Sequence, residues 1–103
     1  MADFMKILQQ AQEMQGRFQQ LQEELQQQTV TASSGGGMVT VEANGQGTVR
    51  SIKIDPSVVN PADVEMLEDL LLVAVSEAQK KAQETAQAEM GKLTGGLPFK
   101  LPF

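Results

Sequence analysis

The side chains of this sequence that could do chemistry are mainly cations on two segments with helical periodicity, residues 3–28 and about 60–93. Lysine and arginine in such segments can contact phosphate groups, which is how proteins bind a nucleic-acid backbone. The candidates are Lys6, Arg17, Lys80, Lys81 and Lys92. The alternative is that the three last-named lysines complement the negative C-terminal end of the second helix and pair with nearby acids. The residues alone favour neither interpretation.

Enzymatic chemistry is not expected. The sequence has neither histidine nor cysteine, which removes the commonest general base and the strongest nucleophile. The acids Glu65, Glu68 and Asp69 could pair for acid–base catalysis or hold a divalent cation, but a solvated helix face is the simpler explanation. The run 35–37 is all glycine but lacks the lysine of a nucleotide-binding loop. We therefore expect no catalytic residues, no metal site, no cofactor and no small-molecule substrate.

The first helix carries an apolar seam on one side. Apolar residues recur at alternating steps of three and four, at Phe4, Ile7, Ala11, Met14, Phe18, Leu21 and Leu25. This spacing keeps one face apolar and predicts a helix over residues 3–28, capped by Asp3. At 1.5 Å per residue the helix is about 40 Å long. Its seam requires a partner surface.

The middle of the chain has the alternation of short strands. The pattern predicts strands over 29–32, 38–43 and 48–54, joined by a flexible loop at 33–37 and a turn at Asn44-Gly45-Gln46-Gly47. In the third strand, alternation places Val49 and Lys53 on one face and Arg50, Ile52 and Ile54 on the other. Arg50 and Lys53 are interpreted as ordinary surface charges.

A second long helix follows the strands. Asn60 as N-cap and Pro61 at the first position predict its start, and an apolar face continues to about residue 93. The fold class is therefore α+β, with a long N-terminal helix, a short antiparallel three-stranded sheet and a long C-terminal helix. Residues 1–93 form a single domain, and residues 94–103 form a tail containing proline and glycine. Because the sheet reverses the chain, the start of the first helix and the end of the second project the same way.

Composition bounds the class of protein. With 103 residues and only four phenylalanines as aromatics, the chain has a small core and is expected to gain stability from a second copy. No apolar run approaches the roughly 20 residues of a membrane span, and the N-terminal residues lack a signal-peptide pattern. We expect a soluble cytoplasmic protein without a membrane partner.

The charges are segregated although the net charge is −5. The helix parts next to the predicted sheet, residues 19–28 and 60–77, hold seven acids and no base, whereas residues 1–18 and 78–93 hold five bases and four acids. The outer halves of the helices are thus less repulsive to phosphate than the halves next to the predicted sheet.

Several ordered segments resemble one protein family. They are Gln9–Gln15, Ile54-Asp55-Pro56-Ser57, Met66-Leu67-Glu68-Asp69-Leu70, Lys80-Lys81 and Leu97-Pro98-Phe99-Lys100-Leu101-Pro102-Phe103. Together they are similar to the YbaB/EbfC nucleoid-associated proteins. The resemblance covers nearly the whole chain.

The resemblance implies a homodimer whose strands form one shared sheet, with helical arms that project like tweezers around double-stranded DNA. It implies a bacterial, nucleoid-located protein that binds DNA with low sequence specificity, organises the chromosome and modulates transcription. The five cations named above would meet phosphates. One departure is the glutamine at five positions of the first helix, where family members tend to carry lysine; these are Gln9, Gln10, Gln20, Gln22 and Gln26. Modest, salt-sensitive affinity is therefore expected.

A protein-binding scaffold or holdase-like chaperone is the alternative function. Paired helical arms also resemble prefoldin-type chaperones, whose arm tips grip unfolded chains. The start of the first helix carries Phe4, Met5, Ile7 and Leu8 beside Lys6, so both interpretations stay open.

Overall fold

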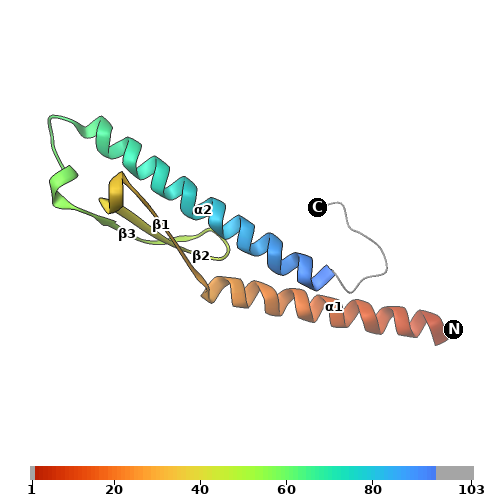
Figure 1. The fold of residues 1–103 in the computed structure, drawn as a ribbon. Coiled ribbons are helices and arrows are strands. Elements are labelled where there is room, and N and C mark those ends of the chain that lie inside the picture. Colours follow the sequence, from red (N-terminus) through yellow and green to blue (C-terminus); the bar gives the residue numbers. More distant parts are fainter. Residues whose placement is uncertain (1, 95–103) are drawn as a thin grey trace.

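The computed structural model describes residues 2–94 as two long helices and a three-stranded sheet (Figure 1). In chain order these are α1 (Ala2–Gln27), β1 (Thr29–Ser34), η1 (Gly35–Gly37), β2 (Val39–Asn44), β3 (Val49–Ile54), η2 (Pro56–Val58) and α2 (Val64–Thr94). The α+β fold class and the element order predicted from sequence are confirmed. The tail predicted at 94–103 lies, except for Thr94, outside the described residues.

The sheet is antiparallel with the strand order β1-β2-β3. The glycines of η1 connect β1 to β2, and all three have positive φ, between 60° and 95°, a region that other residues rarely adopt. Asn44 forms the predicted turn between β2 and β3, since its buried Oδ1 accepts hydrogen bonds from the backbone N–H groups of Gln46 at 2.9 Å and Thr48 at 3.0 Å.

The predicted alternation of the third strand is wrong at one residue. The register shifts by one at Glu42/Ala43, so that Ala43 pairs with Val49. Because a bulge inserts an extra residue, it reverses the side-chain alternation beyond it. Val49 therefore packs against the core, on the same face as Ile52 and Ile54.

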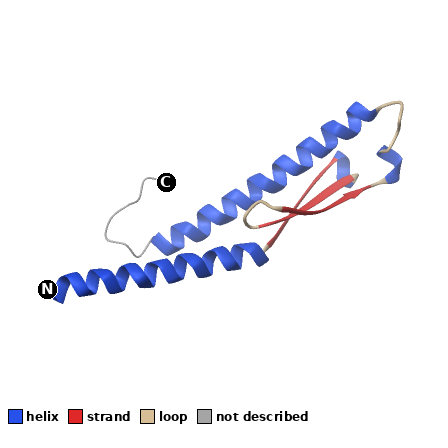
Figure 2. Ribbon diagram, turned by 180° about the vertical axis from the view of Figure 1, so that it is seen from behind, coloured by secondary structure: helices blue, strands red, loops and turns tan. Residues whose placement is uncertain are grey.

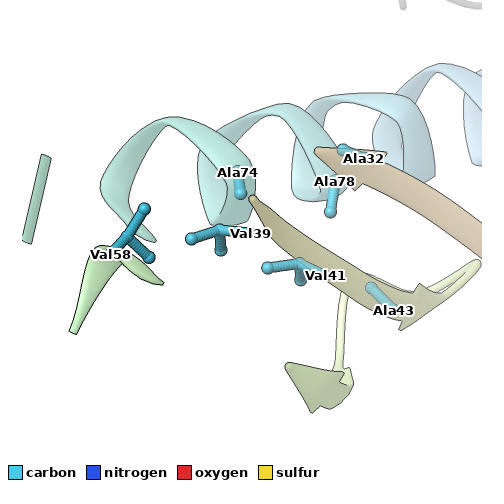
Figure 3. Close-up of a cluster of buried hydrophobic side chains, with 7 residues drawn as sticks. All are labelled: Ala32, Val39, Val41, Ala43, Val58, Ala74 and Ala78. Atoms are coloured by element: carbon cyan, nitrogen blue, oxygen red, sulfur yellow. The ribbon is translucent and has the colours of Figure 1, made fainter. Parts of the chain in front are cut away.

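Helix α2 lies on one face of the sheet and forms the core with it (Figure 3). Its contact residues are small: Ala74 and Ala78 are fully buried. Opposite them lie Val39 and Val41, whose side chains have no exposed surface. Alanine allows the helix backbone to approach the strands closely, so the few aromatic residues of the chain are not needed to fill this core.

The start of α2 differs from the prediction. Asn60 does not cap the helix, because its Oδ1 accepts a hydrogen bond from Ala62 N–H at 3.0 Å in a local turn. Asp63 takes that position, and its Oδ1 accepts from Met66 N–H at 3.3 Å.

In the preceding η2, hydrogen bonds from Ser57 hold the pKa of Asp55 below its usual value.

Helix α1 leaves the sheet as an arm, held near its C-terminal end (Figure 2). Leu21 and Leu25 are buried there. Leu25 O accepts from Gly45 N–H at 2.7 Å, and Gln26 O accepts from Arg50 Nη2 at 2.7 Å. The arginine thus satisfies a carbonyl that the helix leaves unpaired at its C-terminal end. These contacts attach the arm to the turn and to β3.

The far ends of both helices project to the same side, as predicted (Figure 1). The molecule is elongated, with extents of 72 × 22 × 16 Å. Neither helix, within residues 2–94, is long and apolar enough to cross a membrane.

Candidate nucleic-acid interface

Arg17 and Lys92 come together although they are 75 positions apart in the sequence. Both line a shallow groove where the last turns of α2 lie against α1, together with Gln20, Leu21 and Leu93. The antiparallel course of the two helices produces this meeting, because α1 runs toward the sheet and α2 runs away from it. The groove is the structural centre of the predicted phosphate-contacting surface.

Two acids share the groove with these cations. Glu24 and Glu89 also line it, and Glu89 Oε1 lies 3.5 Å from Lys92 Nζ. This ion pair is exposed at its lysine end and holds Lys92 weakly, since the lysine side chain remains 77% accessible. The two acids lower the positive potential of the groove.

Lys6 lies further out on the same face of α1 as Arg17. The two residues are 11 positions apart, which is three helical turns plus about 20°. Lys6 therefore follows Arg17 along the arm at a distance of about 16 Å. Lys6 is exposed and makes no hydrogen bond or ion pair with the described part of the chain.

Lys80 and Lys81 lie beside the sheet and not on the outer arm, where the sequence interpretation placed them. The reason is that α2 is still packed on the strands at Ala78, less than one helical turn before these lysines. Lys81 Nζ donates a 2.7 Å hydrogen bond to Thr31 O. Lys80, one position away on the helix, forms no hydrogen bond or ion pair within residues 2–94. The structure thus separates the five predicted residues into an outer group of three and a pair beside the sheet.

Four of the five nevertheless form a line. Lys81 and Lys92 are again 11 positions apart and share one face of α2. With Arg17 beside Lys92, the order along the molecule is Lys6, Arg17, Lys92, Lys81, which we call the cation row. Two steps of about 16 Å make it about 33 Å long. Sequence reasoning named these residues but missed the row, although the repeated 11-residue spacing was a signal that could have revealed it.

Other hollows lie on the described surface, and one at the start of α2 is lined by Asp63, Glu65 and Asp69 with Met66, Leu70 and Val73. The groove between α1, the turn and α2 is lined mainly by Gln22, Gln46, Gln79 and Gln83, with glycines and apolar residues. No group of three or more acids within residues 2–94 is placed to hold a metal ion.

Comparison with known proteins agrees with the sequence resemblance. The family model described as the YbaB/EbfC DNA-binding family matches residues 1–97. A nucleoid-associated protein of Gemmatimonas aurantiaca is 56% identical over 103 residues, covering 98% of this chain and 99% of the relative. A nucleoid-associated protein of Thermodesulfovibrio yellowstonii is 59% identical over 99 residues, covering 96% of this chain and 85% of the relative.

A solved structure supports the fold. The crystal structure of an uncharacterized protein from Helicobacter pylori superposes with a TM-score of 0.82 at 29% identity, covering 89% of this chain and 97% of that one. The family prediction made from sequence is confirmed. A match over residues 1–97, two relatives more than half identical and a closely similar fold place this chain in the YbaB/EbfC DNA-binding family.

Proposed function

We propose that this protein is a nucleoid-associated protein that binds double-stranded DNA with little sequence preference, and that it organises the bacterial chromosome and modulates transcription. It would act in the cytoplasm, at the nucleoid. The names of the two relatives support the proposal that this is a nucleoid-associated protein. The observation that carries DNA binding is the cation row, whose length of about 33 Å is close to the roughly 34 Å of one duplex turn.

The chemistry of the row favours phosphate over bases. Three of its four members are lysines, which act as point charges, and only Arg17 has the planar guanidinium that favours bidentate contact with a base. Phosphate contacts carry no sequence information, so low specificity follows. Glu24 and Glu89 beside the row, and glutamines elsewhere on α1, keep the affinity modest.

The experiment is a salt series of DNA binding. Fluorescence anisotropy with a labelled duplex of about 30 base pairs, roughly three turns, measures the affinity. Because each phosphate contact adds about −0.9 to the slope of log K against log salt, one row predicts a slope of about −4 and two rows about −7. Two duplexes of different sequence should bind equally within a few-fold. No binding at low salt, or a slope near zero, would contradict the proposal.

We further propose that the protein is a homodimer with a sheet shared through β3. Asp55 N–H donates to Met38 O at 2.8 Å, so alternation directs the backbone groups of Ile52 and Ile54 away from β2. These two side chains lie on the helix-covered face but beyond α2, and they remain 46% and 37% exposed. The opposite edge is less available, because Lys81 already occupies the outward Thr31 carbonyl of β1. A second β3 would cover both the open backbone and the isoleucines.

Substitution at the two edges tests this interface. Ile52→Lys should convert the dimer to a monomer in sedimentation equilibrium, because it places a charge in the proposed contact. Ser33→Lys, on the exposed outer edge of β1, is the matched control and should leave the dimer intact. Circular dichroism checks that both variants fold. A dimer that survives Ile52→Lys but is lost in Ser33→Lys would assign the interface to β1.

The holdase-like alternative is supported by one observation, the exposed apolar tip of α1 at Phe4, Met5, Ile7 and Leu8. A chaperone would suppress aggregation of an unfolded client at low molar ratio, and this activity would be lost on replacing the tip side chains by serine. The cation row has no part in that activity.

A further inference from the structure

The outer half of α1 has an apolar face that nothing in the described part of the chain covers. Leu21 and Leu25 of the seam are buried, but Phe4 and Ile7 are each 61% exposed and Phe18 is 44% exposed. Figure 1 shows the reason: α1 extends well past the end of α2. From Phe18 to Phe4 the open face is about 21 Å long.

The end of α2 lies at the inner limit of this open face. Lys92 and Leu93 line the same groove as Arg17, Gln20 and Leu21 of α1. Leu93 therefore lies about one helical turn of α1 from Phe18, where the exposed part of the seam begins.

The sequence that continues from this point suits the open face. Gly95 and Gly96 allow the chain to leave the helix. Apolar residues then alternate with others, at Leu97, Phe99, Leu101 and Phe103. In an extended conformation this alternation places all four on one side. Prolines at 98 and 102 disfavour a helix and a central strand, so contact through side chains is the available mode.

The lengths also agree. Nine residues, 95–103, span about 30 Å in an extended, strand-like conformation, which exceeds the open 21 Å face enough to allow for the turn at the glycines. Side chains on one side of such a segment recur about every 7 Å, and seam positions of a helix recur about every 5 Å.

We propose that residues 97–103 dock on the exposed seam of α1 of the same chain, running from Phe18 toward Phe4. The apolar side chains of the segment cover the seam, and Lys100 faces solvent beside the arm. The segment stiffens the outer half of α1, which carries Lys6. This proposal does not depend on DNA binding, and it is tested without DNA.

Cysteine cross-linking tests the contact, because the natural chain has no cysteine. Ala11→Cys with Leu101→Cys should form an intramolecular disulfide under mild oxidation. Gln9→Cys with Leu101→Cys is the matched control, since residue 9 lies about 160° from residue 11 around the helix. Non-reducing electrophoresis and intact mass distinguish a disulfide within one chain from a covalent dimer. Equal cross-linking of both pairs, no cross-linking, or a covalent dimer would each overturn the proposal.

Hydrogen exchange of the full chain against a chain lacking residues 97–103 gives an independent measurement. Amides of residues 5–18 should exchange about tenfold faster without the segment, because the outer helix opens locally more often. Amides of β2, which lie in the core, should not change. Equal exchange of residues 5–18 in the two chains would contradict docking.

Discussion

Arg17→Glu is expected to weaken binding to duplex DNA about tenfold at roughly 0.1 M salt, and about a hundredfold if both protomers of a dimer use this residue. Arg17 is one of the two inner cations of the row, lying between Lys6 and Lys92. Losing one phosphate contact removes about 0.9 from the salt slope, which amounts to a factor near ten at this salt concentration. Anisotropy titrations over a salt series measure both quantities. Lys92→Glu should act in the same direction.

Two control variants separate a local contact from a change of net charge. Lys53→Glu alters the net charge by the same amount as Arg17→Glu, but Lys53 lies exposed on β3, away from the groove. It should leave the affinity within about twofold. Glu24→Gln removes an acid from the groove and should strengthen binding about threefold to tenfold, because phosphate then meets less repulsion. Equal losses in Arg17→Glu and Lys53→Glu would show that overall charge, and not the row, governs binding.

Gly45→Ala is expected to destabilise the fold by about 2–3 kcal/mol, the cost of an overpacked contact. A Cβ at this position would lie 2.7 Å from Leu25 O, 3.0 Å from Leu25 Cδ2 and 3.1 Å from Leu25 Cα. Two of these three atoms belong to the backbone and cannot rotate away. The same residues are joined by the 2.7 Å hydrogen bond that attaches α1 to the turn. The helix must therefore move, and the contact of Arg17 with the end of α2 moves with it.

Thermal and denaturant unfolding at one fixed protein concentration measure this effect, because a dimer would make the midpoint depend on concentration. The midpoint temperature should fall by about 10–20 °C. Gly16→Ala is the matched control: a Cβ there meets nothing within 4 Å, and the substitution should stabilise α1 by up to about 1 kcal/mol. If Gly45→Ala unfolded at the same temperature as the natural protein, the close packing of the turn on Leu25 would be wrong.

Most elements were predictable from the sequence because their signals are local. The heptad of α1, the Asn44–Gly47 turn and the apolar face of α2 each depend on residues a few positions apart. The predicted start of α2 was too early for a reason that is also local. Asn60 forms a turn of its own, and Asp63 caps the helix instead. The sequence placed Val49 on the wrong face of the sheet, because a bulge depends on the register between two strands.

Residue type and helical spacing in the sequence were enough to select the five candidate cations, but their arrangement in space could not be predicted from it. That Lys81 bonds to Thr31 O follows from how far α2 stays on the sheet, which the buried alanines decide. The role of Arg50 at the end of α1 likewise required the structure.

The sequence by itself determined the two helices, the hairpin between them and the family, because periodicity, turn residues and ordered motifs are properties of the chain alone. It also determined the 11-residue spacing within each half of the cation row. Only the tertiary structure decided that the pair on α1 continues into the pair on α2. The direction in which α1 leaves the sheet brings Arg17 to the same groove as Lys92. That direction depends on contacts between Leu25 and Gly45 and between Gln26 and Arg50, pairs that are 20 and 24 positions apart.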